Sequence, residues 1–141
     1  MKGLPTLIRL RKQDLDELRR EMVALEAQRA ALIARRERID RELAEEQRFV
    51  AETPDMAFAY GAFAQRVIGE RADIAARKLA LEDDIAALGE RVAEAYAELK
   101  KYEIAMSQRL RRQRAEAARR EQRDLDELGL NMHRRRAAPY V

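Results

Sequence analysis

Two long series of apolar residues, each spaced alternately three and four positions apart, dominate this chain. The first contains Leu4, Ile8, Leu15, Leu18, Met22, Leu25, Leu32, Ile39, Leu43 and Val50. The second contains Tyr60, Val67, Ile74, Leu81, Ile85, Leu88, Val92, Ala95, Leu99, Tyr102 and Met106. A mean spacing of about 3.5 residues is typical of helices that wind around another helix. We call these two series the seams.

A break at Thr53-Pro54-Asp55 lies between the seams, which have nearly equal length. Reversal there would bring Leu4 opposite Tyr102. The pattern therefore predicts an all-α, single-domain, long two-helix antiparallel coiled-coil hairpin whose second helix overhangs at the C-terminus. We expect helices over about 5–50 and 54–136, a turn at 51–54, an unpaired arm from about 107 and a disordered tail at 137–141. Two alternatives are one continuous helix kinked at Pro54 and seams that pair between the chains of a dimer.

Four basic residues interrupt the middle of the seams. Arg29 and Arg36 occupy apolar positions of the first seam, and Arg71 and Lys78 those of the second. In the predicted register Arg29 faces Lys78, Arg36 faces Arg71, and five acids are near: Glu26, Glu37, Asp40, Glu70 and Asp73. Either the long stems lie along the seam while the charges reach outward to these acids, or the hairpin is soft at this level.

The composition excludes several classes of function. There is no Cys, and the one His, His133, lies in a basic segment, so we expect neither catalysis, nor a metal site, nor a cofactor. The N-terminal segment is too charged for a secretion signal, and the longest uncharged stretch, residues 56–65, is far too short to span a bilayer. These features favour a soluble cytoplasmic protein that is not an enzyme.

An aromatic segment, residues 58–65, follows the break. Phe58, Tyr60 and Phe63 cannot all face one seam, so at least one of them should be exposed. Exposed aromatic side chains are good anchors for a partner. The alternative is that they pack against Phe49 and Val50 at the end of the hairpin.

The C-terminal part of the chain differs from the rest in charge. Residues 107–136 hold ten Arg and five acidic residues, a net charge of +5, whereas the whole chain carries +3. Seven of these Arg lie within residues 108–123, which could meet nucleic-acid phosphates or an acidic protein surface, or could simply form a solvated face. Beyond them a short apolar helical face with nothing left in the chain to cover it suggests docking to another protein: Leu125, Leu128 and Met132.

Three segments in this order resemble the FliJ family, the small coiled-coil component of the bacterial flagellar type III export apparatus. They are Leu-x-x-Leu-Ile-Arg-Leu-Arg-Lys at 4–12, the aromatic segment at 58–65 and Leu-Asp-Glu-Leu at 125–128. The resemblance implies a hairpin similar to the central stalk subunit of rotary ATPases. It further implies insertion into the hexameric export ATPase, contact with the membrane export gate and a part in recycling export chaperones, at the inner face of the cell membrane.

The resemblance also assigns residues to two partner-binding surfaces. On the gate-contacting face Phe63 matches the family, Val67 matches conservatively, and Glu70 and Ile74 depart in residue type. Asp126 and Glu127 match an acidic pair of the family's C-terminal segment. The residues expected at the ATPase end lie near both termini: Leu4, Leu7, Arg112, Arg119, Arg123, Leu125, Asp126, Glu127, Leu128 and Met132.

Overall fold

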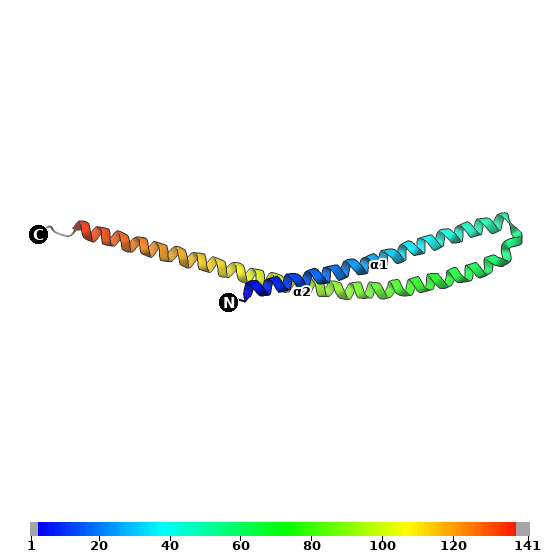
Figure 1. The fold of residues 1–141 in the computed structure, drawn as a ribbon, viewed down its shortest axis with the longest axis horizontal. Helices are drawn as coiled ribbons and strands as arrows, with labels where there is room; N and C mark the ends of the chain where they lie inside the picture. Colours follow the sequence, from blue (N-terminus) through cyan, green and yellow to red (C-terminus); the bar gives the residue numbers. More distant parts are fainter. Residues whose placement is uncertain (1–2, 138–141) are drawn as a thin grey trace. The chain divides into compact units, whose positions relative to one another are not determined.

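Two long helices form nearly all of the computed structural model, which describes residues 3–137. Helix α1 spans Leu4–Glu52, a short 3₁₀ helix η1 spans Pro54–Met56, and helix α2 spans Ala57–Ala137 (Figure 1). No strand occurs among residues 3–137. The predicted all-α helical hairpin is confirmed. Of the expected disordered tail, Ala137 closes α2 and residues 138–141 lie outside the described part of the chain.

The reversal of the chain falls at Thr53 and η1. The Thr53 amide donates to the Phe49 carbonyl over 2.9 Å, which closes the last turn of α1, and Thr53 then leaves the helical region with φ −133° and ψ 81°. Its carbonyl accepts from the Met56 amide over 3.0 Å, while its side chain makes no capping hydrogen bond. A proline disfavours the helical conformation at the residue before it, which here is Thr53. Helix α1 therefore continues to Glu52, and Ala51 and Glu52 are helical although the sequence predicted the turn there. The alternative of one kinked helix is wrong.

The chain divides into two compact units. The hairpin unit is Lys12–Tyr96, in which the two helices run side by side in opposite directions (Figure 1). The terminal unit combines residues 3–11 with the part of α2 that begins at Ala97.

Burial in both units follows the seams. All seven buried residues among those that the structure describes are seam positions: Leu4, Leu15, Ile39, Val67, Ile74, Leu88 and Leu99. In the hairpin unit Ile39, Val67 and Ile74 form one cluster against which Leu32, Leu43 and Phe63 pack. In a two-helix structure each helix can cover only one stripe of the other, so the seams decide what is buried.

The terminal unit is covered only at its start. Leu4 and Leu99 are buried there, and Ile8 lies with Met106 and Leu110 around one shallow groove. Every residue from 110 to 137 is exposed although α2 stays helical throughout. This long exposed segment, residues 110–137, is called the arm below.

Candidate partner-binding surfaces

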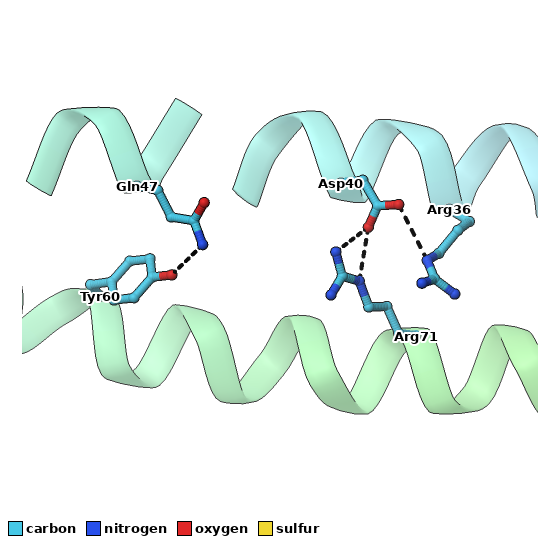
Figure 2. Close-up of polar contacts among 5 residues, drawn as sticks. All are labelled: Arg36, Asp40, Gln47, Tyr60 and Arg71. Atoms are coloured by element: carbon cyan, nitrogen blue, oxygen red, sulfur yellow. Dashed lines mark hydrogen bonds and ion pairs between the residues drawn. The ribbon is translucent and has the colours of Figure 1, made fainter. Parts of the chain in front are cut away.

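Asp40 joins two of the four seam-breaking cations. Arg71 donates to Asp40 Oδ1 from its Nε over 2.8 Å and also from Nη2, and Arg36 Nε donates to Oδ2 over 3.3 Å (Figure 2). Arg36 and Asp40 are one turn apart on α1, whereas Arg71 comes from α2. The carboxylate therefore neutralises a cation from each helix at the level where the sequence predicted that Arg36 and Arg71 face each other.

The pKa of Asp40 reflects this arrangement. The hydrogen bond from Arg71 lowers the pKa of the carboxyl below its ordinary value, and the charges of Arg71 and Arg36 act in the same direction. Partial desolvation opposes them. Asp40 therefore remains ionised over a wider pH range than a free aspartate.

Glu82 gathers the other two cations. Arg29 Nε lies 3.3 Å from Glu82 Oε1 across the interface, and Lys78 Nζ lies 4.0 Å from the same atom. All four cationic side chains keep 32–45% of their surface exposed. The interpretation in which stems lie along the seam and charges reach outward describes this geometry. Glu82 was missed at the sequence level, although its position four residues after Lys78 is the spacing of a helical ion pair.

The four residues assigned to the gate-contacting face divide into two buried and two accessible ones. Val67 and Ile74 are only 3% and 2% exposed, so their side chains lie inside the hairpin and cannot present an outward face. Phe63 is half-buried beside the guanidinium of Arg66, whose Cζ lies 5.2 Å from the ring centroid, and Glu70 is also half-buried. At Val67 and Ile74 the seam predicts the observed burial, whereas the resemblance to the family assigned both residues to a partner-binding face. Both side chains belong to the cluster that holds the helices together.

The aromatic segment has one fully presented ring. Phe58 is 97% exposed, and it does not pack against Phe49, which is itself 48% exposed. Tyr60 instead turns its hydroxyl toward α1, where it accepts a hydrogen bond from Gln47 Nε2 over 3.0 Å (Figure 2). At least one exposed aromatic residue was predicted here, and Phe58 is that residue.

The residues expected at the ATPase end all belong to the terminal unit but differ in accessibility. Leu4 is buried and Leu7 half-buried, so Leu4 holds the unit together and is not free to bind another protein. The other members are exposed: Arg112, Arg119, Arg123, Leu125, Asp126, Glu127, Leu128 and Met132. Leu125, Leu128 and Met132 are 51–57% exposed and share one helical face.

Two leucines of the terminal unit that are more than half exposed were missed by the sequence analysis. Leu130 in the arm is 57% exposed and Leu10 near the N-terminus is 51% exposed. Both are large apolar residues that lie outside the seams, and this combination could have identified them in the sequence. With them the terminal unit presents apolar side chains on more than one face of each helix.

Two kinds of functional feature are absent from residues 3–137. Between residues 3 and 137 no group of three or more His, Asp or Glu side chains is placed to hold a metal ion. Neither described helix has a stretch long and apolar enough to cross a membrane. The exposed arm, the partly exposed residues around Phe63 and the exposed Phe58 are the candidate partner-binding surfaces.

Comparison with known proteins gives one match. A family model described as "Flagellar FliJ protein" matches residues 1–138. The chain has no match among curated protein sequences or solved structures.

Proposed function

The chain belongs to the FliJ family, and on that premise we propose that it is a non-enzymatic, stalk-like protein that engages and stimulates the flagellar export ATPase hexamer. The family itself places the chain in the flagellar protein-export apparatus, as the resemblance at residues 4–12, 58–65 and 125–128 indicated. In this proposal the protein acts in the cytoplasm, links the ATPase to the membrane export gate and helps to recycle export chaperones.

The observation that carries the proposal is the uncovered arm. Residues 110–137 form a continuous helix in which every residue is exposed, and Leu125, Leu128 and Met132 are more than half exposed. A helix with no apolar stripe covered by its own chain gains little stability from packing, so a partner is the expected source of its order. The sequence of the arm suits a partner that offers both acidic groups and a shallow apolar surface.

The charge of the arm suits an interface that forms and breaks repeatedly. Its arginines are exposed, and Arg120 lies 3.9 Å from Glu116 with both side chains more than half exposed. Exposed ion pairs contribute roughly 0.2–1 kcal/mol each, so several of them give orientation and fast association without a long-lived complex. Successive subunits of a ring could be engaged in turn by such contacts.

In this proposal the protein contacts the export gate through the accessible residues of the gate-contacting face that the family resemblance implies. Phe63 and Glu70 are half-buried, whereas Val67 and Ile74 would become available only if the two helices separated. We therefore place the gate contact on Phe63 and Glu70, with Arg66 beside the Phe63 ring as a neighbouring charge.

Point variants of the arm test the proposal. The triple variant Leu125→Ser, Leu128→Ser, Met132→Ser should lower stimulation of the export ATPase by about tenfold or more, because apolar anchors dominate binding energies. The measurement is the rate of ATP hydrolysis by the ATPase of the same flagellar system against the concentration of added protein.

A matched control uses exposed apolar residues of the hairpin unit. Val23→Ser, Ile68→Ser, Leu79→Ser replaces side chains that are 66%, 57% and 62% exposed and should leave stimulation unchanged. Equal loss in both triple variants, or full stimulation by the arm variant, would refute the role assigned to the arm.

A further inference from the structure

A shallow groove of about 610 Å³ runs between α1 and α2 in the hairpin unit, apart from the surfaces described above. Five apolar residues line it and are called its floor below: Leu25, Ala31, Leu32, Ala80 and Leu81. The three leucines are half-buried and the two alanines are exposed. We call this feature the arginine groove, after the three cations that also line it: Arg35, Arg38 and Arg77.

These three arginines are exposed and uncompensated. Within residues 3–137 none of them makes an ion pair or side-chain hydrogen bond, unlike Arg29, Arg36 and Arg71 at the same level of the hairpin. Asp84 is the one acid that lines the groove. The groove therefore combines an apolar floor with an excess of two positive charges.

We propose that the arginine groove is a docking site for an acidic amphipathic helix of a partner protein. The two alanines have short side chains, so a third helix could approach both helices closely and place its apolar stripe over the leucines. Acidic residues beside that stripe would meet Arg35, Arg38 and Arg77. Asp84 would repel them, which favours an occupant whose acidic part lies toward the arginines.

A helix fits this groove better than an extended peptide. Strand addition requires a sheet edge with unpaired backbone groups, whereas here the walls are helices whose backbone groups bond within each helix. Nucleic acid would use the arginines but would have no use for an apolar floor between them. The site is separate from the arm, so this inference does not depend on the proposed action on the ATPase.

The first experiment locates the binding site in the full chain. The probe is a synthetic helical peptide with a leucine stripe flanked by glutamates and a nitroxide label at one end. NMR line broadening should appear at amides of residues 25–38 and 77–84. Broadening confined to residues 108–123 would mean that the basic arm merely attracts an acidic peptide, and it would overturn the proposal.

The second experiment measures affinity after charge reversal. Arg35→Glu with Arg77→Glu should weaken binding of the acidic peptide by about tenfold or more, because two attractions become repulsions. The matched control, Arg41→Glu with Arg48→Glu, makes the same charge change at exposed residues of α1 that do not line the groove. Weakening by the same factor in both variants would show attraction to net charge alone and would count against a site.

A third variant tests the floor without altering charge. Ala80→Gln keeps high helix propensity but fills the groove, so the peptide should lose most of its affinity. Ala72→Gln, at an exposed position of α2 away from the groove, should bind as the unaltered chain does. Unchanged affinity in Ala80→Gln, or preference for a peptide with lysine in place of glutamate, would contradict the proposal.

Discussion

At the scale of single residues, Asp40 is the clearest link between charge and stability. It accepts hydrogen bonds from Arg36 on its own helix and from Arg71 on the other (Figure 2). Because the hydrogen bond and charge of Arg71 lower its pKa in the folded protein, the folded state binds a proton less readily than the unfolded chain. The resulting stabilisation is present above the unfolded pKa of about 3.9 and is lost as the pH falls through that value toward the folded pKa.

Replacement of Asp40 should therefore have a pH-dependent effect. Asp40→Asn is expected to lower the melting temperature at pH 6, and the gap to the unaltered chain should narrow as the pH falls from 5 to 3. Thermal unfolding followed by circular dichroism at several pH values measures this. Asp83→Asn, at an exposed position, controls for the loss of one negative charge. A gap that stays constant or widens in acid would contradict the account of Asp40.

The seam cations lead to a second expectation. Arg36→Leu with Arg71→Leu places apolar side chains at seam positions, while the remaining Asp40 side chain is 41% exposed and stays hydrated. The melting temperature should rise, by roughly 2–4 °C for each kcal/mol gained. Arg41→Leu with Arg48→Leu, outside the seams, should change it little. An unchanged or lower melting temperature in the seam variant would show that the charged contacts stabilise the hairpin at least as much as apolar side chains at these positions, and it would contradict this expectation.

At the scale of helices, periodicity predicted most of what the structure shows. The seams contain every buried residue in the part of the chain that the structure describes, because two helices cover only one stripe of each other. The observed turn lies at Thr53–Met56, later than the predicted turn at 51–54. Pro54 disfavours the helical conformation only at Thr53, the residue before it, so Ala51 and Glu52 remain in α1.

The accessibility of the assigned partner-binding residues was harder to predict than the identity of the buried ones. Burial of Val67 and Ile74 follows from their seam positions. Their assignment to an exposed face came from the family resemblance, which gives no information on whether a side chain is exposed. The ion pair of Glu82 with Arg29 and the arginine groove both involve residues of two helices. The apolar pattern of a single helix does not reveal which residues of the other helix lie beside it.

Core packing gives a prediction at this scale. Ile74→Ala should lower the free energy of unfolding by roughly 2–4 kcal/mol, because Ile74 is 2% exposed and its loss leaves a cavity against Ile39 and Val67. Leu79→Ala, at a residue that is 62% exposed on the same helix, should cost much less. Urea unfolding measures both values. Similar costs for the two variants would mean that the cluster around Ile74 does not hold the helices together.

At the scale of the whole molecule, stability and the proposed contact with the ATPase are assigned to different parts of the chain. The seams bury apolar residues in the hairpin unit and at the start of the terminal unit, and the arm contributes no buried residue. A helix end of this kind can be altered with little effect on the remaining fold. The chain belongs to the FliJ family, and the proposed contact with the export ATPase would use this separation.

The most direct test of the central claim is stimulation of the export ATPase by a chain lacking residues 124–141. Helicity per residue and the melting temperature should stay close to those of the full chain, because the deleted residues that the structure describes are all exposed. The account predicts that stimulation is abolished. Full stimulation by the shortened, folded chain would contradict it.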